Sequence, residues 1–563
     1  MVIDYKGTSF SFKKIRKTKR LKQIRVIGVI LLIIFSYFLV TNILESGKIK
    51  KIQALLLETK TDEASARFKK IESSLLHPKT KKELMALIHL FSDEYSEAAD
   101  ILTGLGDTST SIAYGKFLNY FSDRAEYRKL GIYTDYLMKK IKKVDRGEEL
   151  LFYKALYKTG MFDFRQSVET IRQMPPGPRE KKEKQLVLVN RIDEQLKSGK
   201  VNYIFDSGGK PLAYYDMVKK KTVSLAPGIS FDAFTADFEK SIKFYHLTLD
   251  MKAQAKIHRL FRDFNGSFLL FNLGDSGIAA AYSKPVDKKK ANTNTVFYET
   301  YEPGSILKIL TMFAYLKFYR KDIEVFPFHC KGLWQMGDKI FYDWKTHNTV
   351  ETCEDALAVS CNLVFARIGV GLGTKRLSDI FNRFYFNSEG LKDLFLTFKT
   401  GKTNGKISTD YRLANMAVGL NEVSITTFHS ALISAVFSQN GSINTPHLIM
   451  NKKNLFNLGF YNHDPQLVEI FKENIIFFKI KNAMVEVVEG RGGTGRRSKV
   501  DFVKVALKTG TAGDKKLGLD AVLTGFFPAD KPQYAFAFRL ERGGRAELNG
   551  ARFLKDFLTA FYR

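Results

Sequence analysis

The sequence predicts an α+β fold that follows a helical region and one membrane-spanning helix. Three observations support this prediction. Residues 26–44 carry no charge, residues 48–195 are charged, Leu-rich and almost free of proline before Pro175, and short strand and helix patterns alternate after Val201. With 563 residues and 45% apolar side chains, the chain is long enough for two or three domains with substantial cores.

The N-terminal segment has the pattern of a membrane anchor. Residues 1–25 hold nine Lys and Arg residues against one acid, and the uncharged run 26–44 would form a helix of about 28 Å, close to the hydrocarbon thickness of a bilayer. The basic tail is therefore expected in the cytoplasm and the chain after Glu45 outside it. A cleaved signal peptide is the alternative, but the apolar run is long and no small-x-small cleavage site follows Leu44.

The formal net charge of +30 raises the question of a nucleic-acid partner. No RNA- or DNA-binding motif is present, and without residues 1–44 the remaining chain still carries a net charge of +22. We therefore expect no nucleic-acid partner. The favoured interpretation is solvated surface charge, and attraction to anionic lipid or wall polymers is the alternative.

Three cysteines lie within a short span of the C-terminal half. In an oxidising compartment two of them can pair, and Cys330 with Cys353 is the predicted disulfide. No metal site is expected, because three cysteines at these spacings, with His329 and His347 nearby, match no usual zinc pattern.

Residues 45–199 are predicted to form an α-helical region outside the cytoplasm. In three segments a small residue is followed four and seven residues later by larger apolar residues. These segments begin at Ala64, Ala98 and Ser167. The starts are 34 and 69 residues apart, close to one and two lengths of a tetratricopeptide-type helix pair, although the register between the segments is poor. Such a region either binds partners or serves as a spacer that sets the distance from the membrane.

The pattern changes after Val201. Residues 200–245 are predicted as a β-rich linker, with two strands around a Gly-Gly turn in Tyr203–Tyr215. A domain over 246–563 is then expected to hold an antiparallel sheet flanked by helices, with a long helical insertion. Its expected elements are strand 247–250, helix 251–261, the hairpin strands 267–273 and 278–283, the closing strands 503–507, 521–526 and 534–541, and the last helix 551–562.

A serine and a lysine follow Pro303-Gly304, two residues that interrupt the secondary structure before them. Ser305 and Lys308 are three residues apart at the start of an apolar helix, so their side chains share one face. A serine hydroxyl becomes nucleophilic when a neighbouring base removes its proton, and burial can lower the pKa of a lysine enough for it to be that base. The helix N-terminus adds a positive partial charge at the serine. Chance alone supplies roughly three such S-x-x-K spacings in a chain of this length, so further motifs have to decide.

Two further motifs follow in order. They are Ser360-Cys361-Asn362 and Lys508-Thr509-Gly510-Thr511, of which chance would supply the second only about 0.05 times. The ordered set S-x-x-K, S-x-N and K-T-G is that of penicillin-binding proteins and serine β-lactamases.

With these motifs, residues 200–563 resemble the transpeptidase domain of penicillin-binding proteins, most closely the monofunctional class B type. Further stretches carry the resemblance: Leu247–Asp250, Gly266–Leu270, Tyr301–Ser305, Glu354–Leu357, Gly419 with Thr426, and Met484–Val488. The helical region does not look like the usual class B pedestal. The glutamate-centred motifs of the glycosyltransferase domain are lacking, so strand polymerisation by this chain is not expected.

The resemblance assigns roles in acylation. Ser305 would attack the carbonyl between the two terminal D-alanines of a peptidoglycan stem peptide, and Lys308 would take the serine proton. Ser360 would relay a proton toward the leaving amine, helped by Lys508. The amide of Asn362 would hydrogen-bond the substrate backbone and orient Lys308.

The resemblance also assigns the recognition of the substrate's terminal carboxylate. Lys508 and the hydroxyls of Thr509 and Thr511 would bind it, and Gly510 would let ligand approach the strand closely. Backbone N–H groups of Ser305 and Thr511 would form the oxyanion hole. Beside the site, Cys361 is expected to be a small buried residue, and Trp344 either lines the cleft or belongs to the core.

The implied function is that of a serine-type peptidoglycan D,D-transpeptidase, with a possible D,D-carboxypeptidase side activity and no cofactor. The alternatives are a β-lactamase or β-lactam sensor on the same fold, and a non-catalytic scaffold. Expected partners are stem peptides, β-lactams as covalent inhibitors, the bacterial cytoplasmic membrane and wall-synthesis proteins such as a glycan polymerase. The protein would be a single-pass inner-membrane protein with its catalytic domain outside the cytoplasm.

Overall fold

The computed structural model of the chain describes residues 46–72, 78–105, 114–123, 126–140, 147–161, 163–174, 197–240, 243–290, 292–319, 325–404, 407–453, 461–513 and 516–563. The predicted tail 1–25 and membrane helix 26–44 lie outside these residues. Within the described ranges, no helix combines the length and the apolar content that crossing a bilayer requires.

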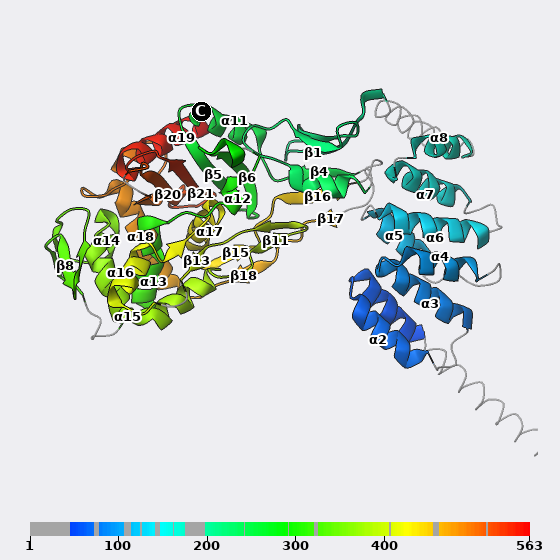
Figure 1. Ribbon diagram of the computed structural model, residues 1–563, viewed down its shortest axis with the longest axis horizontal. Coiled ribbons are helices and arrows are strands. Elements are labelled where there is room, and N and C mark those ends of the chain that lie inside the picture. The colour runs from blue at the N-terminus through cyan, green and yellow to red at the C-terminus, as the bar shows by residue number, and fades with distance from the viewer. Residues whose placement is uncertain are drawn as a thin grey trace, which may run out of the picture. The chain divides into compact units, whose positions relative to one another are not determined.

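The described residues fall into two compact units, divided near residue 178. The first is all-helical, and Figure 1 shows its helices stacked side by side in chain order. It consists of a helix over 46–57, α2 (Thr61–Ile71), α3 (Pro78–Phe91), α4 (Tyr95–Thr103), α5 (Tyr114–Asp123), α6 (Tyr127–Lys140), α7 (Gly147–Gly160) and α8 (Phe164–Arg172).

The apolar spacing seen in the sequence forms the interior of this unit. Ala64, Phe68 and Ile71 are buried along one face of α2, and Ala98 and Leu102 are buried along α4. These positions recur at three- and four-residue intervals, so each helix buries a single stripe between its neighbours. The helical prediction therefore matches the structure over the described residues of 46–174, while a tetratricopeptide architecture stays a prediction.

The second unit is built on an antiparallel five-stranded sheet in the order β19-β20-β21-β5-β6. Its strands are β5 (Asn265–Asn272), β6 (Gly277–Lys284), β19 (Ala506–Ala512), β20 (Asp520–Phe527) and β21 (Tyr534–Glu541). The first hairpin and the closing strands β20 and β21 are thus those that the sequence predicts. The strand predicted over 503–507 is wrong in its bounds, because β19 begins only at Ala506 and runs on through Lys508–Thr511 to Ala512.

Side chains alternate between the two faces of this sheet, as the two-residue period of a strand requires. From β5, Phe268 and Leu270 point into a core with α11 (Met251–Leu260) and α19 (Ala551–Tyr562), whereas Leu269 and Phe271 point into the larger core on the other face. Figure 1 shows α11 and α19 on one side of the sheet and α17 on the other. Helix α17 (Thr427–Ser438) is buried on all sides, as expected of a central helix.

A helical subdomain is inserted between β6 and β19. Its helices are α13 (Lys308–Lys317), α14 (Cys353–Val359), α15 (Asn362–Arg383), α16 (Asp410–Val418), α17 and α18 (Asn474–Glu489). Helix α15 packs against α13 and α16, and α18 packs against α14 and β19. The insertion therefore covers the β19 edge of the sheet with α18 and with the turn η4, which carries Ser305.

The segment predicted as a β-rich linker, 200–245, is an integral part of a second sheet. This six-stranded sheet has the order β17-β16-β4-β1-β2-β3. Its strands are β1 (Lys200–Phe205), β2 (Pro211–Asp216), β3 (Lys221–Ser224), β4 (Phe244–Leu247), β16 (Ile449–Lys453) and β17 (Tyr461–Asn462). Pairing with β16, some 200 residues later in the chain, is a long-range contact that no local pattern in 200–245 could indicate.

Short elements complete the unit. They are η2 (Asp232–Phe234), α10 (Thr235–Phe238), η3 (Lys288–Lys290), α12 (Thr295–Tyr298), η4 (Gly304–Leu307), β7 (Phe328–Cys330), β8 (Leu333–Met336), β9 (Lys339–Tyr342), β10 (Asn348–Val350), β11 (Leu391–Asp393), β12 (Leu396–Phe398), β13 (Lys402–Thr403), β14 (Val423–Ser424), β15 (Ser442–Asn444), β18 (Leu467–Glu469), η6 (Arg496–Ser498) and η7 (Ala546–Gly550).

The predicted disulfide between Cys330 and Cys353 is wrong. All three cysteines are free and buried. Cys353 begins helix α14, whereas the thiols of Cys330 and Cys361 both point to the carboxylate of Asp343. The predicted pair does not form because the fold places Cys330 beside Cys361, which is farther along the chain than Cys353.

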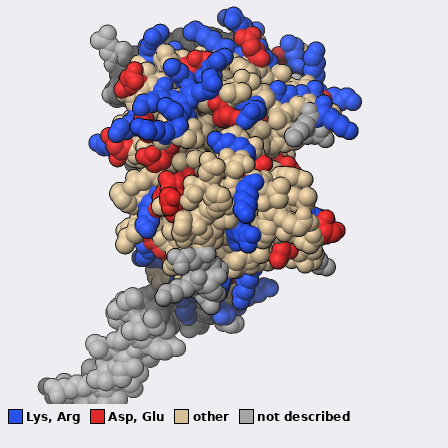
Figure 2. Space-filling model, turned by 90° about the vertical axis from the view of Figure 1, so that its left-hand side faces the viewer, with Lys and Arg blue, Asp and Glu red and all other residues tan. Residues whose placement is uncertain are grey.

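Charge on the face drawn in Figure 2 is mixed. Lys and Arg side chains lie among Asp and Glu side chains there, with uncharged surface between them. This distribution agrees with the interpretation of the basic residues as solvated surface charge on this face.

Candidate active site

Ser305 stands on a tight turn where the chain enters the helical subdomain. It lies in the 3-10 turn η4, directly before α13. Gly304 has a φ of +55°, and its N–H donates a hydrogen bond of 2.9 Å to Gly419 O. A Cβ at this position would lie 3.0 Å from Thr511 O. Glycine is therefore needed both for the backbone conformation and for the close approach of strand β19.

Lys308 is completely buried at the first residue of α13. Its Nζ donates hydrogen bonds to Ser360 O at 2.8 Å, Ser360 Oγ at 3.3 Å and Asn362 Oδ1 at 2.6 Å. Burial, which disfavours the charged form, lowers the pKa of this lysine to about 8. Among the hydrogen bonds between described residues, none joins Lys308 Nζ to Ser305 Oγ, a contact that catalytic groups often tighten only around substrate.

Ser360 is held in a left-handed backbone conformation between two helices. Its φ is 59° and its ψ is 41°, and it ends α14 while Asn362 begins α15. This reversal turns both its carbonyl and its hydroxyl toward Lys308. The Oγ atom also accepts a hydrogen bond of 2.9 Å from Lys508 Nζ, so one hydroxyl lies between two buried amines.

Lys508 reaches this hydroxyl from the middle of β19. The strand is fixed in register by pairing with β20, where Lys508 lies opposite Thr524. Its side chain is fully buried, and its Nζ also donates to Thr509 O at 2.9 Å. Burial and then the positive charge of Lys308 hold the pKa of Lys508 well below its usual value. The two lysines therefore resist carrying charge at the same time.

The other residues of the third motif connect β19 to its surroundings. Thr509 Oγ1 lies 2.6 Å from Thr494 Oγ1, and Thr511 Oγ1 accepts a hydrogen bond of 3.0 Å from Ala546 N. A Cβ on Gly510 would lie only 2.6 Å from Pro303 O. The glycine thus lets the strand pack on the turn that carries Ser305. The sequence predicted a different role for Gly510, the close approach of ligand to the strand.

Sequence reasoning missed Asp343 and left Trp344 undecided. Asp343 Oδ2 accepts a hydrogen bond of 3.2 Å from Leu363 N. Burial alone would raise the pKa of this carboxylate, but His347 and Lys308 lower it more, so the pKa lies below its usual value and the group stays charged. Trp344 is 41% exposed, and its Nε1 donates to Ser360 O at 3.2 Å. Trp344 therefore lies at the rim of the site. Its contact with the second motif depends on the fold of the chain and not on a local sequence pattern.

The arrangement suits acyl transfer by a serine. It combines a partly exposed hydroxyl on a helix N-terminal turn, a buried lysine with a lowered pKa, and a second hydroxyl that links this lysine to another amine. The structure thus brings Lys308, Ser360, Asn362 and Lys508 into one hydrogen-bonded group, with Ser305 one helical turn before Lys308.

Comparison with known proteins assigns the fold and the family. Residues 266–558 match the penicillin binding protein transpeptidase domain, and this match covers more than half of the chain and all three motifs. The chain belongs to this family.

Curated relatives agree over the same part. The chain is 28% identical over 269 residues to stage V sporulation protein D of Bacillus subtilis (strain 168), covering 44% of this chain and 39% of that protein. It is 24% identical over 357 residues to the peptidoglycan D,D-transpeptidase MrdA of Haemophilus influenzae, covering 55% of this chain and 54% of that protein. The chain thus matches only about half or less of the length of these relatives.

Solved structures share the fold of the second unit. Penicillin-binding protein A from Mycobacterium tuberculosis aligns with a TM-score of 0.57 at 18% identity, over 65% of this chain and 100% of that chain. The D,D-transpeptidase domain of a peptidoglycan glycosyltransferase from Eggerthella lenta aligns with a TM-score of 0.56 at 19% identity, over 64% and 98%. At these identities the likeness establishes the fold of the transpeptidase domain.

Proposed function

We propose that the protein is a peptidoglycan D,D-transpeptidase that cross-links stem peptides through an acyl-enzyme on Ser305. The observation that carries this proposal is the Ser360 hydroxyl held between the buried amines of Lys308 and Lys508. The family match and the relatives named as peptidoglycan D,D-transpeptidases support it.

In the acylation step, Ser305 Oγ attacks the carbonyl between the two terminal D-alanines, and neutral Lys308 accepts its proton. With a pKa of about 8, roughly one lysine in ten is neutral at pH 7, far more than for an exposed lysine. The amide of Asn362 holds Lys308 Nζ at 2.6 Å, which limits the positions from which the amine can act.

Breakdown of the tetrahedral intermediate needs a proton on the leaving D-alanine amine. Ser360 Oγ is suited to deliver it, because Lys508 Nζ donates to this oxygen at 2.9 Å and can replace the proton. The substrate carboxylate binds beside Lys508 and the hydroxyls of Thr509 and Thr511. Its negative charge favours the protonated form of Lys508 and so charges the donor when substrate is present.

The acyl-enzyme is then released to an acceptor amine of a second stem peptide, or to water as a D,D-carboxypeptidase side reaction. A β-lactamase or β-lactam sensor would use the same acylation step. A non-catalytic scaffold would not acylate at all. Adduct formation therefore separates a scaffold from the other functions, and the lifetime of the adduct separates a β-lactamase from a transpeptidase.

Incubation of the purified protein with a fluorescent penicillin tests the proposal. The wild type is expected to form a covalent adduct that persists for many minutes, and Ser305→Ala is expected to form none. An adduct on the Ser305→Ala protein would refute the nucleophile, rapid hydrolytic release would favour a β-lactamase, and no adduct on either protein would favour a scaffold.

We also propose that residues 26–44 anchor the protein in the bacterial cytoplasmic membrane, with residues 1–25 inside. The charge distribution of residues 1–44 supports this orientation. N-terminal sequencing of the mature protein separates an anchor from a cleaved signal peptide, because cleavage would leave a chain that begins near residue 45.

For the helical region we propose a tetratricopeptide-like surface that binds wall-synthesis proteins such as a glycan polymerase. The stacked helices and their repeated buried stripe support this role over that of a plain spacer. Deletion of 48–195, with the anchor kept, is expected to leave penicillin acylation intact and to abolish partner capture. Lost acylation would mean that this region belongs to the catalytic fold.

A further inference from the structure

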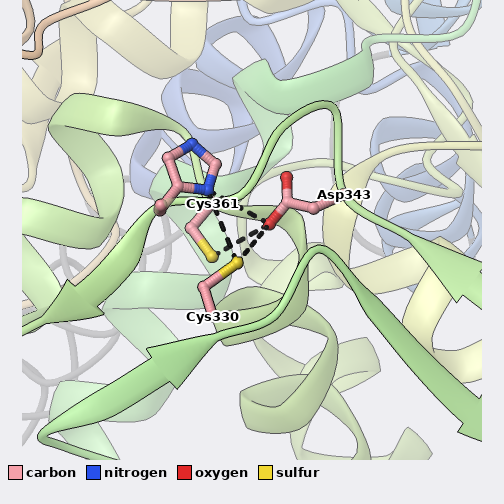
Figure 3. A group of neighbouring side chains, drawn as sticks. Cys330, Asp343 and Cys361 are labelled. Carbon is pink, nitrogen blue, oxygen red and sulfur yellow. Dashed lines mark hydrogen bonds and ion pairs between the residues drawn. The ribbon is translucent and has the colours of Figure 1, made fainter.

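Four side chains with metal-ligating atoms converge beside the second motif. They are Cys330 at the end of β7, Asp343 and His347 in the loop between β9 and β10, and Cys361 between α14 and α15. One ligand atom from each lies within 4.8 Å of every other. Figure 3 shows the thiols of Cys330 and Cys361 directed at the carboxylate of Asp343.

Four of the six distances between these ligand atoms are close to those of a coordination shell. Asp343 Oδ2 lies 3.5 Å from Cys330 Sγ, 3.0 Å from Cys361 Sγ and 3.4 Å from His347 Nδ1, and His347 Nδ1 lies 3.6 Å from Cys330 Sγ. Ligand atoms at ordinary zinc bond lengths on a tetrahedron are about 3.3–3.6 Å apart for the S–O, S–N and N–O pairs measured here. Three of the four separations fall in that range before any ion is present.

The histidine presents the correct nitrogen. His347 Nε2 lies 3.1 Å from Val359 O, and a carbonyl can only accept a hydrogen bond. A proton is therefore on Nε2, and Nδ1 is the nitrogen that faces the Cys330 thiol and the carboxylate and that can bind a metal ion in place of a proton. A carbonyl partner on the far nitrogen is the usual outer support of a metal-bound histidine.

The cluster is also closed to solvent. Cys330 and Cys361 have no exposed surface, and the side chains of Asp343 and His347 are 0% and 2% exposed. Two thiols and an imidazole are soft and borderline ligands that select Zn²⁺ over Mg²⁺ or Ca²⁺. Four protein ligands leave no open position, which is the pattern of a structural zinc and not of a catalytic one.

We propose that Cys330, Asp343, His347 and Cys361 form a structural Zn²⁺ site that holds the Ser360–Asn362 turn in its active position. Cys361 separates the two residues that contact Lys308 Nζ. A bound ion ties that turn to β7 and to the loop after β9, whose Trp344 Nε1 also donates to Ser360 O. The positioning role rests on the proposed function, whereas ion binding does not.

The first test measures the ion itself. Full-length protein is purified in detergent under reducing conditions, and its zinc content is determined by mass spectrometry. We expect about one Zn²⁺ per chain and, after exchange, a Co²⁺ derivative with thiolate-to-metal absorption and the spectrum of a tetrahedral ion. Wild-type protein that neither retains zinc nor takes up Co²⁺ into thiolate coordination would overturn the site and leave a hydrogen-bonded cluster.

Variants then identify the ligands. Cys330→Ala and His347→Ala are expected to lose stoichiometric zinc and the thiolate absorption, while Cys353→Ala is the matched control because this cysteine is buried outside the cluster. Zinc retained by both cluster variants, or lost equally from the control, would overturn the assignment. The Co²⁺ spectrum of the wild type decides the question even if a cluster variant fails to fold.

The second test links the ion to the active site. Chelation of the wild type in the presence of reductant is expected to slow acylation by a fluorescent penicillin at least tenfold, and Zn²⁺ but not Mg²⁺ is expected to restore it. Unchanged acylation after proven loss of zinc would overturn the positioning role. Protein that binds zinc but is never acylated would instead refute the proposed function and leave the metal site standing.

Discussion

Lys508 Nζ donates a hydrogen bond of 2.9 Å to Ser360 Oγ, and this contact joins strand β19 to the turn between α14 and α15. Because Ser360 Oγ also accepts from Lys308 Nζ, this hydroxyl provides a path for protons between the two amines. The hydroxyl, more than either amine, is thus expected to couple the parts of the site.

The first prediction removes that hydroxyl without straining the backbone. Ser360→Gly tolerates the left-handed conformation at φ 59° and is expected to lower the rate of penicillin acylation by about 10²- to 10⁴-fold, the usual contribution of a positioned proton donor. The second-order rate constant with a fluorescent penicillin is the measurement. Ser438→Ala, which removes a buried hydroxyl bonded to Ala435 O away from the site, is the control. A loss below threefold in Ser360→Gly would contradict the relay.

The second prediction concerns pH. Lys308 acts as a base only when neutral, and its pKa is lowered to about 8, so the acylation rate is expected to rise with pH and to level off above about 8. Lys308→Arg keeps the charge but cannot lose its proton at these pH values, and it is expected to be slowed by about 10²-fold or more at every pH. Stopped-flow acylation across pH 6 to 9.5 measures both. A flat wild-type profile would exclude Lys308 as the base.

The third prediction concerns the packing of β19 on the Ser305 turn. In Gly510→Ala the new methyl would lie 2.6 Å from Pro303 O, so the strand or the turn must shift. We expect destabilisation by about 1–3 kcal/mol and a strong loss of acylation. Thermal unfolding and penicillin labelling measure the two effects. Gly47→Ala, where a Cβ meets nothing within 4 Å, is the control and should leave both unchanged.

The fourth prediction concerns Asp393, a buried acid away from the site. Its Oδ2 accepts hydrogen bonds from Leu448 N and Ile449 N, and burial nevertheless raises the pKa of this carboxyl to about 6. The folded state therefore holds a proton that the unfolded state has released between about pH 4 and 6, and stability from this group falls by up to ~3 kcal/mol as pH rises through that window.

Asp393→Asn removes this titration. Relative to the wild type, the unfolding temperature of Asp393→Asn is expected to rise as the pH increases from 4 to 7 and to stay constant above pH 7. Thermal unfolding in matched buffers measures it. A difference that does not change with pH would show that Asp393 titrates normally.

Much of the transpeptidase domain could be predicted from local patterns. The hairpin strands on either side of Gly274–Gly277 and the closing strands are short, mostly apolar runs bounded by turn residues, and these signals act over a few residues. The strand predicted over 247–250 is wrong in its bounds: β4 spans Phe244–Leu247 and shares only Leu247 with it. Asp250 instead caps helix α11 by accepting a hydrogen bond from Lys252 N.

Contacts between distant segments were beyond such patterns. Pairing of β4 with β16 made the predicted linker part of a sheet, and the packing of β7 brought Cys330 to Cys361 instead of Cys353. The same packing assembled a four-ligand cluster from residues whose spacing resembles no zinc motif.

By itself, the sequence indicated the three motifs of the candidate site and their order, because the motifs are short and each depends on local spacing. Only the tertiary structure decided that Ser360 lies between Lys308 and Lys508, 52 and 148 residues away. The reason is physical: a hydrogen bond between distant residues depends on how whole helices and strands pack, and that packing is set by burial of their apolar faces along the entire domain.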